Sequence, residues 1–216
     1  LSGAAVTLAG SSDNTPATVN GADVALSLTG NDLYVNLSKV VVADVEASNG
    51  VIHAIDKVLV PPTDNALSDT DSTISELVTA LAAEGEGQEF SILLQAVTTA
   101  SLADALDGAG PFTVFAPTDA AFEALIEALE TDAAGLLARD DLGDILKQHV
   151  ISGSEIDSVM AYAANGADVQ TLNANSEVTV LIEDGVLTVE GADVVITDVK
   201  ASNGVIHVIS SVIVTT

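Results

Sequence analysis

The sequence contains no cysteine and no tryptophan, and only five of its 216 residues are basic. Without cysteine, neither a disulfide nor a thiolate zinc site is available to the fold. The 32 acidic residues give a formal net charge of −27, which disfavours binding to nucleic acid or to an anionic membrane surface. Aromatic residues make up 3% of the chain, too few for a stacking platform that binds sugars or bases.

Long hydrophobic runs are also absent, since none approaches the ~18 residues that cross a bilayer. We therefore expect no direct membrane insertion, although an apolar content of 48% is ample for a buried core. The acid surplus is typical of a protein that stays soluble in salty surroundings, so we expect a secreted, extracellular or cell-surface location. Calcium is the alternative explanation for the acid surplus, and its weak candidate ligands are Asp69, Asp71, Glu84 and Glu86.

Motifs of known catalytic machinery are missing as well. The sequence has no phosphate-binding loop, no dinucleotide fingerprint, no H-E-x-x-H zinc motif and no G-x-S-x-G nucleophile motif. Pairs of carboxylates carry little information in so acidic a chain. We predict that the protein is not an enzyme, has no catalytic residues and needs no cofactor, with calcium as the one open possibility.

An internal repeat dominates what is present. "VEASNGVIHAIDKVLV" (residues 45–60) returns as "VKASNGVIHVISSVIV" (residues 199–214), an offset of 154 positions. Such self-similarity indicates that one structural unit is used twice. Apolar and polar residues alternate within each copy, which predicts strands. The pairs Asn49-Gly50 and Asn203-Gly204 predict tight turns that lead into strands 51–59 and 205–213. His53 and His207 occupy the same place in the two copies, and we interpret both as core histidines bonded to backbone.

The segment between the copies has a different, helical pattern. A break at residues 61–65 ("PPTDN") precedes it. Apolar residues at helical spacing predict helices within residues 72–85, 90–106, 119–132, 142–152 and 156–166. Gly85 is the predicted C-cap of the first helix, and Asp119 is the predicted N-cap of the third. A short apolar strand, "FTVFAPT" (residues 112–118), interrupts the helices.

Two of these stretches resemble the signatures of the fasciclin domain family: "GPFTVFAPTDAAFEAL" (residues 110–125) and "ASNGVIHVISSVIV" (residues 201–214). The resemblance implies an α+β fold, a fasciclin-like β-sandwich wedge with packed helices, preceded by a partial β-rich repeat. It divides the chain into the C-terminal β half of one domain (1–62), a linker (63–72) and a complete domain (73–216). It also implies that strand 112–118 lies beside strand 205–213 in the core.

The family resemblance also points to contact residues. "ILKQHVISG" (residues 145–153) stands where the family usually has a Tyr-His pair that is linked to contact with cell receptors. Here Gln148 replaces the tyrosine and His149 remains. We interpret His149 as structural first and as an adhesion contact second, with Gln148 and Asp119 as the other contact candidates.

The partial domain (residues 1–62) raises a question of strand pairing, because the chain has one first-signature strand and two second-signature strands. Exchange among identical chains cannot supply the missing strand. Three explanations stay open: the missing half lies upstream in a longer tandem protein, residues 1–62 form a reduced β module, or the unpaired edge recruits another chain by strand addition. The edge candidates are Val51, Ile52, Ala54, Ile55, Val58 and Leu59.

Three functions follow in order of preference. The first is a non-enzymatic extracellular adhesion or matrix module in a tandem repeat protein, which makes protein–protein or cell-surface contacts. The second is a subunit of an extracellular filament, such as a biofilm matrix fibre, that self-associates through the half domain. The third is a small-molecule or glycan-binding domain, which requires a pocket with convergent groups.

Overall fold

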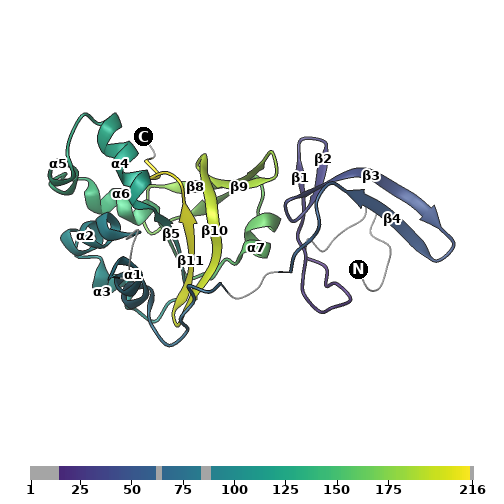
Figure 1. Ribbon diagram of the computed structural model, residues 1–216, viewed down its shortest axis with the longest axis horizontal. Coiled ribbons are helices and arrows are strands. Elements are labelled where there is room, and N and C mark those ends of the chain that lie inside the picture. The colour runs from purple at the N-terminus through teal and green to yellow at the C-terminus, as the bar shows by residue number, and fades with distance from the viewer. Residues whose placement is uncertain (1–14, 62–64, 84–88, 215–216) are drawn as a thin grey trace. The chain divides into compact units, whose positions relative to one another are not determined.

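The computed structural model describes residues 15–61, 65–83 and 89–214 (Figure 1). The chain divides into two compact units. The first unit comprises residues 1–63, 157–167 and 180–188. The second comprises residues 64–156, 168–179 and 189–216.

The first unit contains a four-stranded antiparallel sheet in the order β1-β2-β3-β4. Its strands are β1 (Leu26–Thr29), β2 (Asp32–Val35), β3 (Ser38–Ala47) and β4 (Gly50–Ile55). Helix α7 (Ser158–Ala163) belongs to the same unit. Buried apolar side chains of the N-terminal segment lie near β1 and β2, whereas every residue from 41 to 50 is exposed.

The larger sheet has seven strands in the order β6-β5-β11-β10-β9-β8-β7. Most of its residues belong to the second unit, whereas residues 180–188, in β8 and β9, belong to the first. The strands are β5 (Phe112–Pro117), β6 (Val150–Ser152), β7 (Ala167–Gln170), β8 (Glu177–Glu183), β9 (Val186–Val189), β10 (Ala192–Ala201) and β11 (Gly204–Ile209). Helices gather on one side of β5 and β11 in Figure 1. They are α1 (Ile74–Ala83), α2 (Ser91–Thr99), α3 (Ala103–Leu106), α4 (Asp119–Ala128), α5 (Ala133–Leu137) and α6 (Leu142–Gln148).

This arrangement confirms the α+β class, and it places the main core between the helices and the centre of the sheet. Ile74 of α1, Phe122 of α4 and Ile206 of β11 are each at most 1% exposed and belong to one apolar cluster. The helical periodicity of α1 to α6 arises from this packing, because each of these helices turns its apolar face to the same cluster. No helix of the described residues is long and apolar enough to span a membrane.

Strands β5 and β11 run side by side and parallel, as the resemblance implied. Phe112 pairs with Gly204 and Pro117 pairs with Ile209, with no register shift between them. Every residue of both strands is buried. A parallel pair in the sheet interior has both faces covered, which explains why both sequences read as continuous apolar runs.

The two repeat copies share one backbone design. Hairpin β3–β4 has register shifts between Val40 and Val42 and between Val42 and Val45, and hairpin β10–β11 has them at the equivalent positions. Asp44 and Asp198, which are 154 positions apart, both take positive φ angles at the second shift, 56° and 59°. These bulges are therefore a property of the repeated sequence itself.

Three details of the predicted repeat hairpins were wrong. Ala47 pairs with Gly50 and Ala201 with Gly204, so the turn residues are Ser-Asn and each glycine is the first residue of a strand. Strand β4 ends at Ile55 rather than at 59, because the Asp56 side chain accepts a bond from the Lys39 N–H (2.8 Å) and closes the ladder. Strand β11 likewise ends at Ile209. Gly85, the predicted C-cap, lies outside the described residues.

Candidate functional site

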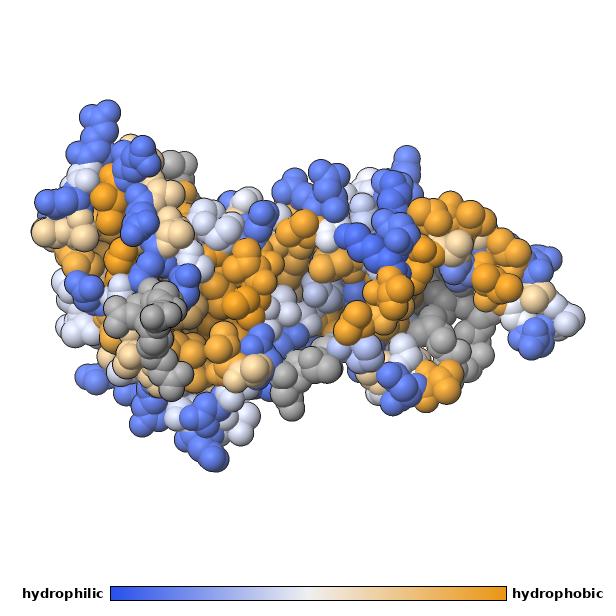
Figure 2. Space-filling model, in the orientation of Figure 1, coloured by the Kyte–Doolittle hydropathy of each residue, from blue (hydrophilic) through white to orange (hydrophobic). Residues whose placement is uncertain are grey.

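Equivalent side chains of the two hairpins differ sharply in exposure. Ile52 of β4 is 59% exposed, whereas its equivalent Ile206 of β11 is 1% exposed. Val45 of β3 is 45% exposed, and its equivalent Val199 of β10 is 1% exposed. Figure 2 shows hydrophobic side chains at the surface over β3 and β4. Hairpin β3–β4 (residues 38–55) is therefore an apolar surface, although its sequence is that of a core element.

The position of each hairpin in its sheet explains this difference. Strand β11 lies between β10 and β5, so it is hydrogen-bonded on both sides. Strand β4 lies at the edge of its sheet, and among the described residues its ladder partner is β3. An edge strand presents unpaired N–H and C=O groups that can accept a further strand.

The structure places the predicted edge residues on or beyond this edge. Val51, Ile52, Ala54 and Ile55 belong to β4, where they alternate between half-buried and exposed. Val58 and Leu59 follow the strand, and Val58 is largely exposed. Whether these side chains take part in assembly stays a prediction.

Asn203 connects the β10–β11 turn to two helices, a role that the sequence did not suggest. Its Oδ1 accepts from the Ile74 N–H at the start of α1 (2.9 Å). Its Nδ2 donates to the carbonyls of Leu106 (2.7 Å) and Gly108 (2.8 Å) at the end of α3. The equivalent Asn49 is exposed. Both turns have an asparagine, although neither turn needs a positive φ angle at that position. This was the signal in the sequence that the asparagine side chain does more than form the turn.

Gln148 and His149 lie in the core and not at the surface. Gln148 is 8% and His149 is 2% exposed. Because the His149 Nε2 accepts from the Ile213 N–H (2.8 Å), its Nδ1 carries the proton and donates to the Ile145 carbonyl (2.8 Å). Burial lowers the pKa of His149 to about 4, so the ring is neutral near pH 7. In this fold the imidazole joins the C-terminal segment to α6. Whether Gln148 or His149 takes part in adhesion stays a prediction.

Asp119 is not the N-cap of its own helix, which corrects the sequence prediction. Thr118 caps α4, because its Oγ1 accepts from the Ala121 N–H (3.1 Å). The Asp119 carboxylate instead caps α2, where it accepts from the N–H groups of Ser91 (3.1 Å) and Ile92 (2.9 Å) and from the Ser91 hydroxyl (2.6 Å). The residue before α2, Phe90, has no capping side chain of its own. A carboxylate from a neighbouring helix therefore satisfies these donors.

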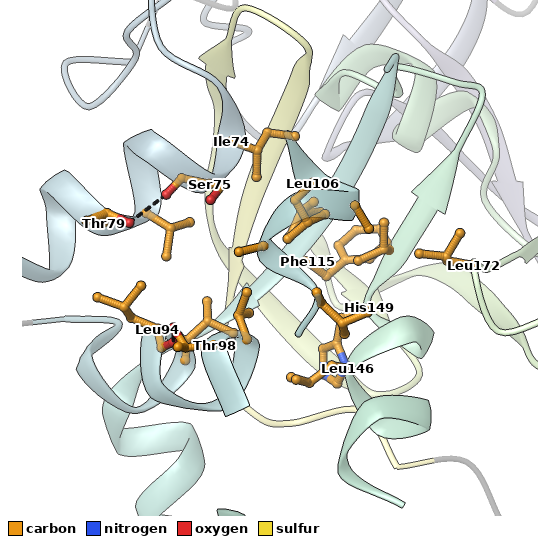
Figure 3. A pocket seen from close by; sticks show the side chains of 18 residues that line it. Ile74, Ser75, Thr79, Leu94, Thr98, Leu106, Phe115, Leu146, His149 and Leu172 are labelled. Carbon is orange, nitrogen blue, oxygen red and sulfur yellow. Dashed lines mark hydrogen bonds between the residues drawn. The ribbon is translucent and has the colours of Figure 1, made fainter. Parts of the chain in front are cut away.

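An apolar cavity of about 120 Å³ lies among α1, α2, α3 and the sheet (Figure 3). Phe115 and Leu146 line it together with His149, and the helices contribute mostly aliphatic side chains. The threonine hydroxyls at its wall are already bonded within their helices, Thr79 to the Ser75 carbonyl (2.8 Å) and Thr98 to the Leu94 carbonyl (2.7 Å). The cavity thus offers an uncharged apolar surface at neutral pH.

The calcium candidates do not form a metal site among the described residues, where no group of three or more metal-binding side chains occurs. The Asp69 carboxylate instead accepts from the Ser72 hydroxyl (2.7 Å) and the Asp71 N–H (3.1 Å), and these bonds lower its pKa. Glu84 and Glu86 lie outside the described residues.

With this geometry in place, comparisons with known proteins identify the family. The Fasciclin domain family matches residues 3–61 and 88–215, and the chain belongs to this family. A solved FAS1 domain pair of the insect cell adhesion molecule fasciclin I has the same fold over 89% of this chain and 67% of that one, with a TM-score of 0.54 and 19% identity.

Curated relatives include bacterial and animal proteins. Protein sll1483 of Synechocystis is 38% identical over 68% of this chain and 76% of its own length. Transforming growth factor-beta-induced protein ig-h3 of Sus scrofa is 28% identical over 91% of this chain, and human periostin is 30% identical over 83%. The matched regions span 26% of ig-h3 and 19% of periostin, so the chain is similar to a part of each of these animal proteins.

Proposed function

We propose that this chain is a non-enzymatic extracellular adhesion or matrix module that makes protein–protein contacts through hairpin β3–β4. The observation that carries the proposal is the exposed apolar face of this hairpin. Its large exposed side chains are Val41, Val42, Val45 and Ile52. Several large apolar side chains exposed on one hairpin of so charged a protein are typical of an interaction site.

Two further facts support an adhesion role. The fold is shared with a domain pair of a cell adhesion molecule, fasciclin I. In addition, the charge of −27 disfavours non-specific association of the chain, so that specific contact is favoured at surfaces with little charge. A valine-rich hairpin is such a surface.

The test is an adhesion assay with a triple variant, Val42→Thr, Val45→Thr and Ile52→Thr. Threonine keeps β-branching and strand propensity while it removes apolar surface. Beads coated with the wild-type chain should adhere to each other or to cells under flow, and beads that carry the triple variant should detach at lower shear. Circular dichroism and denaturant unfolding establish that the variant remains folded.

Val195→Thr is the matched control, because Val195 lies on β10 of the second hairpin and is 56% exposed. This change removes one exposed valine side chain away from β3–β4 and should leave adhesion unchanged, whereas Val45→Thr alone, the single change of the same kind within the hairpin, should weaken it. Equal adhesion of the triple variant and the wild type would contradict the role of the hairpin. No adhesion by the wild type would contradict the function itself.

Self-association into a filament is a more specific form of this proposal, in which the contact partner is another copy of the chain. Light scattering during size-exclusion chromatography distinguishes the two, since a filament subunit should form higher-order species that the triple variant loses. A strict monomer at high concentration, with and without calcium, would exclude the filament and leave adhesion to other proteins.

The cavity supports a second candidate function, the binding of a small, uncharged, apolar molecule. An apolar cavity of roughly 150 Å³ in another protein binds benzene, so about 120 Å³ accommodates a molecule of similar or slightly smaller size. Phenol and benzene should perturb the NMR signals of Val97 and Leu106 in the wild type. Val97→Phe fills the cavity and should abolish these changes, whereas Ile126→Phe, outside the cavity, should not. Identical titrations of wild type and Val97→Phe would exclude the site.

A further inference from the structure

We propose that the cavity among α1, α2, α3 and the sheet binds a small aliphatic alcohol, whose tail enters the cavity and whose hydroxyl donates a hydrogen bond at its rim. This inference rests on the second proposed function, the binding of a small apolar molecule in this cavity, and it names the head group and the chemical class of that molecule. Every residue that lines the cavity belongs to the second unit, so one unit forms the whole site.

The deep end of the cavity suits an aliphatic tail. Phe115 and Leu146 line it and are each 3% exposed. His149 is the polar side chain at this end, but its Nε2 accepts from the Ile213 N–H and its Nδ1 donates to the Ile145 carbonyl. Both ring nitrogens are therefore occupied. A polar ligand group placed here would lose its water without gaining a side-chain partner, which costs free energy.

Hydroxyl groups lie at the opposite end, where the cavity meets the surface. The rim hydroxyls belong to Ser75 and Thr79 of α1 and to Thr98 of α2. Both threonines are exposed, and Ser75 is half-buried. Figure 3 shows these side chains across the cavity from Phe115 and His149. The other lining residues apart from His149 are apolar, so the cavity has a polar rim and an apolar interior.

Two of the three rim hydroxyls can accept a hydrogen bond from a ligand but have already donated their own proton. The Thr79 hydroxyl donates to the Ser75 carbonyl (2.8 Å), and the Thr98 hydroxyl donates to the Leu94 carbonyl (2.7 Å). A hydroxyl has one proton and two lone pairs, so each threonine keeps the capacity to accept. A ligand head that donates a hydrogen bond fits this rim better than a head that only accepts.

Charge disfavours an acidic head group. Helix α1 contains Glu76 and helix α3 contains Asp104, whereas α1, α2 and α3 contain no lysine or arginine that could pair with a carboxylate. The net charge of −27 adds repulsion from the whole chain. A fatty-acid anion is therefore a poor ligand for this rim. A hydroxyl head donates a hydrogen bond and carries no charge, so an alcohol is the class that fits both ends of the cavity.

The experiment compares three probes of similar size on the whole chain. Pentanol and butyl methyl ether have as many heavy atoms as benzene, but only pentanol donates a hydrogen bond, and pentanoate carries a carboxylate instead. NMR titration follows the methyl signals of Leu93 and Leu146, which line the cavity. Pentanol should bind roughly threefold to tenfold more tightly than the ether, which corresponds to one hydrogen bond, and pentanoate should bind more weakly than either.

The decisive variant removes the rim hydroxyls through Ser75→Ala, Thr79→Val and Thr98→Val. It should bind benzene and the ether like the wild type but lose the preference for pentanol. Thr99→Val is the control, because Thr99 is exposed on the same helix as Thr98 and does not line the cavity. This control should keep the preference. The ratio of the two affinities is measured within each protein, so a general change in stability does not imitate the expected result.

Equal affinities of the wild type for pentanol and the ether would overturn the proposal, as would tighter binding of pentanoate or a preference that survives in the rim variant. Pentanol shifts that persist in Val97→Phe would place the alcohol outside the cavity and would overturn it too. Benzene separates this failure from that of the proposed function. If benzene binds and pentanol shows no preference, the cavity binds apolar molecules without recognising a head group. If no probe binds, the cavity function fails together with this inference.

Discussion

The backbone N–H of Asp198 donates a hydrogen bond to Nδ1 of His207 across the β10–β11 hairpin (3.4 Å). Asp44 makes the equivalent bond to His53 in β3–β4 (3.2 Å). Both aspartates sit at the bulge with positive φ, so the histidine accepts from a group that the bulge removes from the ladder. The repeated histidine thus belongs to the bulge and bonds to backbone in both copies, as predicted, but His53 is half-buried and only His207 lies in a core.

His207→Leu should destabilise the protein far more than His53→Leu. His207 is 1% exposed, and its Nε2 bonds the Ile156 carbonyl (2.7 Å), which would lose its partner. A buried carbonyl left unsatisfied costs about 1–3 kcal/mol, whereas the half-buried His53 should cost less than about 1 kcal/mol. Urea denaturation of the two variants measures the difference. Equal losses would show that the first hairpin is as constrained as the second.

Asn203→Ala should cost about 3 kcal/mol, because it removes three side-chain bonds to α1 and α3 in a buried position. Asn49→Ala should change the unfolding free energy by less than about 0.5 kcal/mol, because Asn49 is exposed. Denaturant midpoints of the two variants provide the comparison. A small effect at Asn203 would mean that water replaces the amide at this junction.

Asp119→Ala should lower stability by about 1–2 kcal/mol through the loss of the cap on α2. Asp119→Asn keeps one acceptor and should lose less. Hydrogen exchange should locate the effect at Ser91 and Ile92. Asp119 was also predicted as an adhesion contact, so the bead assay should accompany the measurement: reduced adhesion at unchanged stability would favour a contact role over the capping role.

His149 should make the protein less stable as the pH falls from about 6.5 to about 4. The unfolded chain binds a proton near the ordinary pKa of 6.5, whereas in the folded protein burial lowers the pKa to about 4. Between these values the unfolded state holds more protons, so acid favours unfolding, by at most about 3 kcal/mol. Below pH 4 this contribution no longer changes.

His149→Gln isolates this effect from the titration of the many carboxylates. The unfolding free energy of the wild type and the variant should be measured at several pH values in one salt concentration. The difference between the two should shrink as the pH falls from 6.5 to 4, because only the wild type loses the histidine contribution. A constant difference over that interval would contradict the lowered pKa.

Local structure was largely readable from the sequence, because helices and strands here follow simple periodicity. The helix at residues 74–83 and the strand at 112–117 were predicted within a few residues, as was their place in an α+β fold. Residues whose partners lie far along the chain were not readable. Asp119 resembles the cap of the helix it begins, and only packing brings the N-terminus of α2, some 28 positions earlier, within reach of its carboxylate.

The two copies of "ASNGVIH" show most clearly which features the local sequence determines and which the tertiary structure determines. By itself the sequence determined a Ser-Asn turn, a bulge with Asp at positive φ and a histidine bonded to it, since both copies form them in different surroundings. The tertiary structure alone decided that Ile206 is core and Ile52 is surface. The physical reason is a neighbour: β5 and its helices cover β11, and burial depends on what packs against a strand rather than on the residues within it.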